Sequence, residues 1–185
     1  GLVGSEMCIR DRYNSLLGKI TLASDGNAII GVWIEGQKYF ADSVEDRMIE
    51  NNSLQVFEEC KMWLDKYFKG ERPDINELSL APQGNEFRQA VWRILCEIPY
   101  GKVTTYGEIA KRVAKITNKP KMSAQAVGGA VGHNPVSIII PCHRVIGTSG
   151  SLTGYAGGID IKIKLLKHEG VDMSKMFVPK KSTAK

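Results

Sequence analysis

A cysteine flanked by a proline and a histidine is the strongest chemical feature of this chain. Cys142 lies in the segment Pro141-Cys142-His143-Arg144-Val145, directly after the apolar run Ile138-Ile139-Ile140. A thiol that only fills a core needs no such neighbours. A thiol that reacts does need them, because the thiolate is the nucleophile and a nearby imidazole or positive charge favours it. The sequence therefore predicts that Cys142 is a nucleophile.

The remaining cysteines do not indicate a second chemistry. The chain has four, Cys8, Cys60, Cys96 and Cys142, and none forms a C-x-x-C pair, which argues against a zinc site. Cys60 and Cys96 fall within helical apolar patterns and are interpreted as packing residues. The chain shows no secretory leader and no apolar run of membrane-spanning length. We therefore expect a cytoplasmic protein with reduced thiols, no bound metal and no membrane partner.

Charge is divided unevenly along the chain. Residues 1–86 carry 9 Lys and Arg against 15 Asp and Glu, a net charge of −6, whereas residues 87–185 carry 16 against 5, a net charge of +11. A basic half beside an acidic half favours a polyanionic partner for the basic half, and nucleic acid is the leading candidate. A solvated basic surface is the alternative that charge alone leaves open.

The N-terminal part predicts a small α/β unit over residues 13–76. Two β-type runs within 20–34, separated by Asp25-Gly26-Asn27, predict a hairpin. Apolar residues at helical spacing over 54–68 predict a helix, and the turn residues at 71–74 indicate a linker. This unit contains no recognisable chemistry of its own.

The second unit, expected over residues 77–170, is predominantly helical. One apolar face over 87–98 predicts a helix, and 159–168 predicts another that ends at a glycine. Thr105, with Glu108 three residues later, is expected to cap a third helix, and Ser123 is expected to cap a fourth. The last two helices, joined by a tight turn, resemble a helix-turn-helix.

Two further elements are expected around the cysteine. The apolar residues 137–140 read as a buried strand, and the Gly-rich segment 147–158 reads as a hairpin that could act as a wing. The helix expected over 124–131 is built of small residues, which would let its backbone approach a narrow minor groove. Close helix–helix packing through Ala and Gly is the alternative.

The two ends of the chain are expected to lie outside the fold. Residues 1–12 show neither helical nor strand periodicity, and we interpret them as a non-native leader; an ordinary frayed N-terminus is the alternative. The basic segment 171–185 is expected to be a loose, flexible tail.

The motifs of the second unit resemble those of the O6-alkylguanine-DNA alkyltransferases (methylated-DNA–protein-cysteine methyltransferases). They keep the family's order and nearly its spacing from about 86 to 170, while the N-terminal unit matches more weakly through Leu17-Gly18-Lys19-Ile20. The resemblance implies an α+β protein, with a small ribonuclease-H-like α/β unit followed by a winged helix-turn-helix domain. The matching segments are Phe87…Val91-Trp92, Ile98-Pro99…Gly101, Thr105-Tyr106, Ala126-Val127-Gly128, Asn134-Pro135, Ile140 to Val145, Gly154-Tyr155 and His168-Glu169-Gly170.

The resemblance implies five catalytic residues. Cys142 would accept the alkyl group from guanine O6 in one displacement. His143 would act as the base through a bound water, oriented by Glu169. Tyr106 would donate a hydrogen bond to the flipped base, and Asn134 would hold the turn that ties the helix-turn-helix to the active-site segment.

The resemblance also implies a base pocket and a DNA-binding surface. Val145, Tyr155 and Ala156 would line the pocket, and Arg144 is expected to be a structural ion-pair partner. Gln125 stands where the family commonly places an arginine that fills the space left by the flipped base; Gln is shorter and neutral. The expected DNA-binding residues are Ala124, Gln125, Ala126, Gly128, Lys119 and Lys121, with Arg88 and Lys102 as further phosphate contacts.

The implied function is DNA repair by single-turnover transfer of the methyl group of O6-methylguanine in double-stranded DNA to Cys142, with O4-methylthymine as a second candidate substrate. A thioether has no easy leaving step, so each molecule, expected to be a monomer, would act once and would need no cofactor or metal. A winged-helix regulator or lesion-binding protein without transfer is one alternative. A cysteine hydrolase is the other, although adjacent Cys and His residues make a poor dyad.

Overall fold

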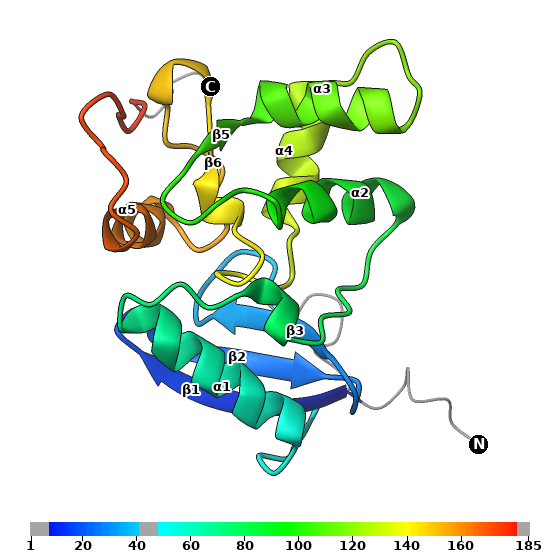
Figure 1. Cartoon of the computed structure of the whole chain (residues 1–185), viewed down its shortest axis with the longest axis vertical. Coiled ribbons are helices and arrows are strands. Elements are labelled where there is room, and N and C mark those ends of the chain that lie inside the picture. Colours follow the sequence, from blue (N-terminus) through cyan, green and yellow to red (C-terminus); the bar gives the residue numbers. More distant parts are fainter. Residues whose placement is uncertain (1–7, 41–47, 181–185) are drawn as a thin grey trace.

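The computed structural model describes residues 8–40 and 48–180, which form two units around a shared hydrophobic core (Figure 1). The first unit is a sheet with one long helix across it, and the second is a group of helices and loops. Side chains of both units belong to one apolar cluster, from Ile20 and Phe57 to Val127 and Leu165. The two units are therefore packed directly against each other, which matters for the site described below.

The sheet of the first unit has four strands in the order β3-β2-β1-β4. The predicted hairpin is confirmed, since β2 (Gly18–Ser24) and β3 (Ile29–Ile34) pair antiparallel around the expected turn. β1 (Cys8–Ser15) pairs antiparallel with β2, and β4 (Met48–Glu50) pairs parallel with β1.

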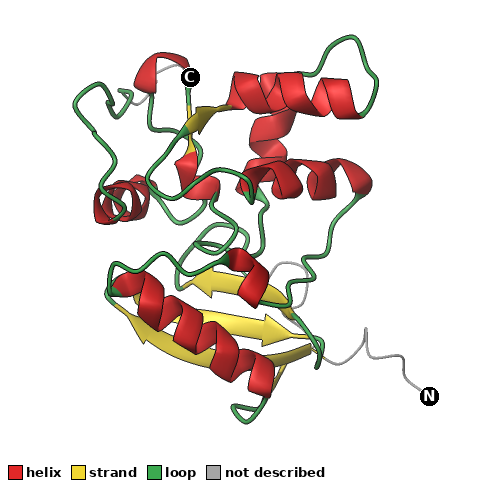
Figure 2. Cartoon of the chain, viewed as in Figure 1, coloured by secondary structure: helices red, strands yellow, loops and turns green. Residues whose placement is uncertain are grey.

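Helix α1 (Gln55–Phe68) covers one face of this sheet, as the apolar spacing predicts (Figure 2). It ends at Lys69, and Gly70 follows with a φ of 87°, the left-handed conformation in which glycine commonly stops a helix. Its inward stripe follows the spacing of a helix buried on one side. The buried residues of the stripe are Val56, Phe57, Cys60, Trp63, Leu64 and Tyr67.

The free edge of β3 is covered by two separate segments. The first segment, residues 79–81, pairs with Ile29. The Ile29 N–H donates to the Ser79 carbonyl (2.8 Å), and the Ile29 carbonyl accepts from the Ala81 N–H (2.8 Å). Further along, Val32 exchanges hydrogen bonds with Pro135 (2.8 Å) and Ser137 (2.9 Å) of the second unit. The sheet therefore continues into the segment that leads to Cys142.

The division of the chain into domains at 13–76 and 77–170 stays a prediction.

The interpretation of residues 1–12 as a leader outside the fold is wrong for the part that the structure describes. Residues from Cys8 onward form β1; Cys8 is 2% exposed, and buried Asp11 makes an ion pair with Lys61 of α1. The strand was not recognised because it buries Cys8 and Asp11, three positions apart and one of them charged, rather than alternate apolar residues. Residues 1–7 lie outside the described residues.

The four expected helices of the second unit are confirmed. Thr105 Oγ1 accepts the Glu108 N–H (3.1 Å), and Ser123 Oγ accepts from Gln125 (3.1 Å) and Ala126 (3.2 Å), so both predicted caps are present. Among the described residues no helix combines the length and hydropathy needed to cross a membrane. The helices are α2 (Glu86–Leu95), α3 (Tyr106–Ile116), α4 (Ala124–Gly132) and α5 (Ile159–His168).

The connection between α3 and α4 is a loop over 117–123 rather than the tight turn expected. Asn118 adopts a left-handed φ of 55°, and Lys119 donates its N–H back to the Ala114 carbonyl (2.8 Å), which ends α3. Pro120 then cannot continue a helix.

The strand expected at 137–140 is not formed. Val136 makes one isolated bridge to β3, after which Ile139 donates to Ser137 (2.8 Å) and Ile140 to Val136 (3.1 Å), so the segment is a series of turns (Figure 2). Ile138 has a φ of 71°, which is costly for a β-branched residue by about 1–2 kcal/mol. Because all residues of this segment are buried, its turns have the same continuous apolar sequence as a buried strand.

The hairpin expected at 147–158 is also absent. The segment contains a short 3-10 turn, η5 (Thr148–Gly150), and the next residues bond to the C-terminal segment: Leu152 donates to the Phe177 carbonyl (2.9 Å). A two-stranded parallel pair of β5 (Thr104–Thr105) and β6 (Val145–Ile146) lies beside this loop. The wing is therefore an irregular loop.

The tail expected to be loose from residue 171 is wrong as far as residue 180. Val171, Met173 and Met176 pack against the buried residues Leu152 and Leu166, so a small apolar cluster docks this segment. The basic charge of the segment indicates a solvated tail, but its three apolar residues anchor it. Residues 181–185 lie outside the described residues.

The ion pair between β1 and α1 gives a test of the first strand. Lys61→Ala leaves the carboxylate of Asp11, whose side chain is 8% exposed, without its partner. We expect the free energy of unfolding, measured with urea, to fall by about 2 kcal/mol, because a buried charge that loses its partner is penalised. Lys111→Ala is the control, since its pair with Glu108 is exposed and should contribute less than about 0.5 kcal/mol. Equal stability of Lys61→Ala and the wild type would contradict the docking of β1.

Candidate functional site

Cys142 begins a short 3-10 turn, η4 (Cys142–Arg144), immediately after Pro141. The turns at 137–140 reverse the chain, so that all three side chains of η4 point into the protein rather than along a strand. The exposed fractions are 4% for Cys142, 0% for His143 and 8% for Arg144. The predicted nucleophile therefore lies in an interior site that is almost covered.

The surroundings of the sulfur act on its protonation in opposite directions. Burial is the largest influence and raises the pKa of the Cys142 thiol. The side-chain amide of Asn134, the charge of Lys162 and the backbone N–H groups at 142 and 143 all lower that pKa. These donors would stabilise a thiolate once it forms, but the thiol needs a base that accepts its proton.

Asn134 ties the end of α4 to the turn that carries the cysteine. Its Nδ2 donates to the carbonyls of Ile140 (2.9 Å) and Val136 (3.3 Å), and its Oδ1 accepts the Val136 N–H (3.0 Å). The side chain is buried, and these bonds use both its donor and its acceptor groups. This arrangement is the one that the predicted positioning role requires.

The carboxylate of Glu169, just after α5, is the centre of a buried polar cluster. Its Oε1 accepts from Arg144 Nε (2.7 Å) and from the Gly101 N–H (3.1 Å). Its Oε2 accepts from His143 Nε2 (2.5 Å), Tyr67 Oη (2.6 Å) and Arg144 Nη2 (3.2 Å). Burial alone would raise the pKa of Glu169, but His143 and Arg144 hold it well below its usual range. Arg144 is thus the ion-pair partner that the sequence suggested.

The imidazole of His143 is bonded through only one of its two nitrogens. Because a carboxylate only accepts, the hydrogen bond to Glu169 places the imidazole proton on Nε2 and leaves a lone pair on Nδ1. That Nδ1 is buried and has no hydrogen-bond partner among the described residues. Burial lowers the pKa of His143 despite the opposing influence of Glu169, so the ring is neutral and can take up a proton.

The sequence did not point to two of the residues around this cluster. Tyr67 was hidden in the apolar stripe of α1, where an aromatic residue normally signals packing only. Lys162 is fully buried; its Nζ donates to the carbonyls of Val145 (2.5 Å) and Thr153 (2.9 Å), and burial lowers its pKa to about 8. A lysine on the same helix face as Leu165 and Leu166 was the available signal for Lys162.

Tyr106 lies at the start of α3 and faces the cysteine. Burial, with the negative charge of a Cys142 thiolate, raises its pKa to about 12. Its hydroxyl donates to the Thr153 carbonyl (2.9 Å), and a Cβ at Gly154 would lie 2.8 Å from that hydroxyl oxygen. The predicted hydrogen bond to a base would require this hydroxyl to leave Thr153.

A cavity of about 440 Å³ lies between α4 and the loop that follows η5. Tyr155, which is close enough to Cys142 to interact with it electrostatically, lines the cavity beside Ala156. Val145 was expected in the same pocket, but it is fully buried in β6 and does not line this cavity. The other lining residues include Lys38, Tyr39, Gly128, Gly132 and His133.

The expected DNA-binding residues lie at the exposed start of α4. Ala124, Gln125 and Ala126 are exposed and Gly128 is half-buried, while the opposite side of the helix packs against the core. Trp92 of α2 fixes that side by donating its Nε1–H to the Ala130 carbonyl (2.9 Å). The small residues of α4 therefore fit both alternatives given by the sequence. One side of the helix packs closely against the core, and the other side is exposed and could approach DNA.

Lys119 and Lys121 lie in the loop before α4 and border a shallow surface hollow together with Lys111 and Lys115 of α3. The sequence reasoning did not include the two lysines of α3, although their four-residue spacing places them on one helix face. Lys102 borders a different hollow, with Glu97 and Arg112, so the structure separates it from this group. Within 8–40 and 48–180, no three His, Cys, Asp or Glu side chains are placed to bind a metal ion together.

Two family models match this chain in succession. Residues 9–82 match "6-O-methylguanine DNA methyltransferase, ribonuclease-like domain", and residues 86–171 match "6-O-methylguanine DNA methyltransferase, DNA binding domain". Together the matches extend from β1 to just beyond α5.

Proteins named methylated-DNA–protein-cysteine methyltransferase are similar over most of the chain. The one from Methanosarcina acetivorans is 46% identical over 159 residues (85% of this chain and 96% of that protein), and the one from Haemophilus influenzae is 40% identical over 159 residues (86% and 84%). Among solved structures, that of Mycobacterium tuberculosis OGT in complex with DNA superposes with a TM-score of 0.75 at 36% identity, covering 91% of this chain and 94% of the other.

The buried imidazole gives a pH-dependent stability with a defined sign. The pKa of His143 in the folded protein lies below its ordinary value of 6.5, so folding favours the neutral ring. Its contribution is present above pH 6.5 and is lost as the pH falls below that value. We expect the free energy of unfolding to fall between pH 7 and pH 5, with up to about 1.4 kcal/mol per pH unit from this one group. Glu169, whose pKa is also depressed, adds to the loss below pH 4.5.

Urea unfolding of His143→Gln across this pH range checks the assignment, because the variant should show a shallower loss. His133→Gln, which removes an imidazole from the end of α4, is the matched control and should keep the wild-type slope. An unchanged slope in His143→Gln would show that another group carries the pH dependence.

Proposed function

Since this chain belongs to the 6-O-methylguanine DNA methyltransferase family, we propose that Cys142 is the residue that accepts the alkyl group. The protein repairs DNA by direct transfer of an alkyl group from O6-methylguanine to one of its own cysteines. The observation that carries the choice of Cys142 is its position beside His143, whose Nε2 is bonded to Glu169 and whose Nδ1 is free to accept a proton. The other three cysteines have no such neighbour in the sequence.

The transfer is a single displacement at carbon. The Cys142 proton passes to His143 Nδ1, through a water that bridges the two groups, and Glu169 stabilises the resulting imidazolium. The sulfur forms a bond to the methyl carbon as the bond from that carbon to guanine O6 breaks. The bonding pair stays with the guanine, which takes up a proton, and Tyr106 is the nearby hydroxyl donor. The thioether persists, so each molecule reacts once.

The target base must leave the duplex to reach Cys142. The cavity beside Tyr155 and Ala156 supports a role for these residues in binding it, because it is bordered by glycines of α4 and by Tyr155, which interacts electrostatically with Cys142. Cys142 is only 4% exposed, so we expect the loop over 153–158 to shift when the base enters. Gly154 and Gly158, with φ values of 77° and 95°, give that loop the backbone freedom to move.

The start of α4 is the surface that we expect to meet DNA. Its exposed residues are Gln125 and, on either side of it, the small Ala124 and Ala126. Four lysines border the hollow between α3 and the start of α4. Gln125 would fill the space that the flipped base leaves. The protein acts as a monomer in the cytoplasm, a location supported by the free thiols of Cys60, Cys96 and Cys142. O4-methylthymine is a second substrate to be compared in the same assay.

The transfer is tested by the mass of the intact protein after incubation with duplex DNA that contains O6-methylguanine. We expect the mass to increase by one methyl group and no more, because the product does not turn over, and peptide mapping should place the methyl on Cys142. Cys142→Ser should abolish the increase, while Cys96→Ser, the control at a partly buried cysteine, should keep it. A methyl group on another cysteine would refute the assignment, and lesion binding without any mass change would favour the lesion-binding alternative.

The DNA-binding surface is tested by the salt dependence of affinity. Lys119→Ala and Lys121→Ala should each weaken binding of lesion-containing and undamaged duplexes alike, and each should reduce the slope of log affinity against log salt by about one. Lys102→Ala is the control, since Lys102 lies at a different hollow. A slope that these two substitutions leave unchanged would contradict docking through the loop before α4.

A further inference from the structure

The N-terminal unit supplies a hydrogen bond to the centre of the active site. Tyr67, near the end of α1, donates its hydroxyl to Glu169 Oε2 at 2.6 Å, across 102 positions of sequence. The same oxygen accepts the His143 Nε2–H at 2.5 Å. Tyr67 is 1% exposed and Glu169 is 4% exposed, so water does not compete for this contact. A side chain of the acidic unit thus shares one oxygen atom with the proposed base.

Several contacts fix the position of the Tyr67 ring. The ring of Trp63 stacks on it at 5.8 Å between centroids, and the ring of Tyr100 meets it edge-on at 6.1 Å. The backbone carbonyl of Tyr67 accepts a hydrogen bond from Nε2 of His168 (2.7 Å), the residue that precedes Glu169 in the sequence. A phenol restrained on two sides and at its backbone can direct its hydroxyl to one place only.

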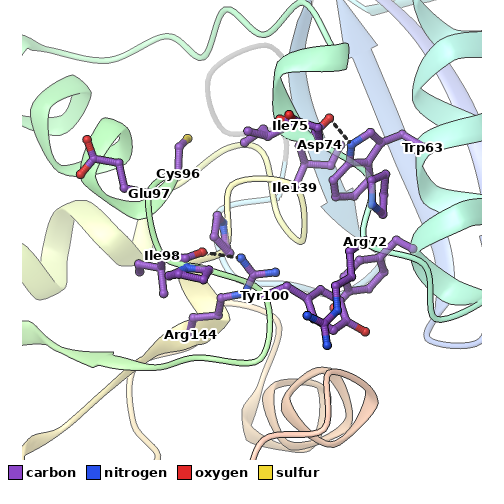
Figure 3. A pocket seen from close by; sticks show the side chains of 14 residues that line it. Trp63, Arg72, Asp74, Ile75, Cys96, Glu97, Ile98, Tyr100, Ile139 and Arg144 are labelled. Atoms are coloured by element: carbon purple, nitrogen blue, oxygen red, sulfur yellow. Dashed lines mark hydrogen bonds between the residues drawn. The ribbon is translucent and has the colours of Figure 1, made fainter.

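This contact lies at the junction of the two units. Tyr67 and Arg144 both line a cavity of about 190 Å³ where α1, the linker at 72–75 and the segment 96–100 meet. Figure 3 shows Arg144 and Tyr100 on one side of this cavity, with Trp63 of α1 opposite, and the dashed line from Arg144 to the Ile98 carbonyl (2.7 Å). The guanidinium that bonds Glu169 is therefore also anchored at this junction.

We propose that Tyr67 is a positioning residue for alkyl transfer, whose hydroxyl orients the Glu169 carboxylate and limits the negative charge that Oε2 presents to His143. The inference rests on the proposed function, because it needs His143 to act as the base. Without the Tyr67 hydroxyl, Oε2 keeps only Arg144 Nη2 (3.2 Å) beside the imidazole, so it would bind the imidazole proton more tightly and favour the imidazolium. An imidazole that is already protonated cannot take the proton of Cys142.

The other groups that face this pair stay in place when the hydroxyl is removed. Arg144 and the Gly101 N–H remain on Glu169, Tyr100 remains against the Tyr67 ring, and the charge of Lys162 still acts on His143. A change in the titration of His143 in Tyr67→Phe is therefore due to the lost hydroxyl. His168 is bonded to the backbone of Tyr67 and is not affected directly.

Tyr67→Phe removes the hydroxyl and keeps the ring, and Tyr100→Phe is the matched control, because its hydroxyl reaches only the His168 carbonyl at 3.4 Å. With saturating lesion-bearing duplex, we expect the single-turnover rate of Tyr67→Phe to fall roughly three- to tenfold, as for the net loss of one intramolecular hydrogen bond. The deficit should grow as the pH falls, and the DNA affinity should not change. Tyr100→Phe should keep the wild-type rate at every pH.

A second measurement does not depend on activity. The chain has three histidines, so each imidazole can be followed by NMR during a pH titration. In Tyr67→Phe the midpoint of His143 should rise by about half a pH unit or more, while those of His133 and His168 stay in place. An unmoved His143 midpoint, a rate that falls equally at all pH values, or an unchanged rate would each overturn the inference. A wild-type protein without transfer would refute the proposed function instead, whatever the titration shows.

Discussion

The buried carboxylate of Glu169 is the interaction on which the arrangement of this protein depends. It receives hydrogen bonds from α1, from the loop after α2, and from the two residues that follow Cys142. A buried charge is tolerated only when its partners satisfy it, and each of these partners would be costly to leave unpaired. The position of the proposed base is therefore set by the packing of both units together, rather than by the cysteine motif alone.

A second constraint acts on the other side of the cysteine. The edge of β3 pairs with residues 135–137, and Asn134 closes the turn that follows. Gln37, in the loop after β3, reinforces this junction, since its Oε1 accepts from the Ile34 N–H (2.8 Å) and from Ser137 Oγ (3.1 Å). The N-terminal unit thus fixes the segment before Cys142 through its sheet and the residues after it through α1. This explains how a unit without recognisable chemistry contributes to the site.

The elements that could be predicted from the sequence are those determined by local interactions. Helix caps such as Thr105 and Ser123 and the apolar stripe of α1 act within a few residues, and the structure has them where they were expected. The neighbours of Cys142 in the sequence are enough to predict a nucleophile. The role of Glu169, which is distant in the sequence, came only from the resemblance to the family.

The features that were missed depend on contacts between distant segments. β1 buries Asp11, whose partner is Lys61 of α1, and the chain turns at 137–140 after the single bridge between Val136 and Val32 of β3. The roles of Lys162 and Tyr67 follow from the carbonyls and the carboxylate that tertiary packing brings to them. No periodicity in one segment contains this information.

Whether Glu169 supports His143 as the base for Cys142 can be measured from the single-turnover rate of methyl transfer in Glu169→Gln. The amide keeps the shape of the side chain but removes the charge that stabilises the imidazolium. With a folded variant and saturating DNA, we expect a rate at least about 100-fold below the wild type, within the range for loss of general-base catalysis. A rate within a few-fold of the wild type, with the methyl group still on Cys142, would show that Glu169 does not have this role.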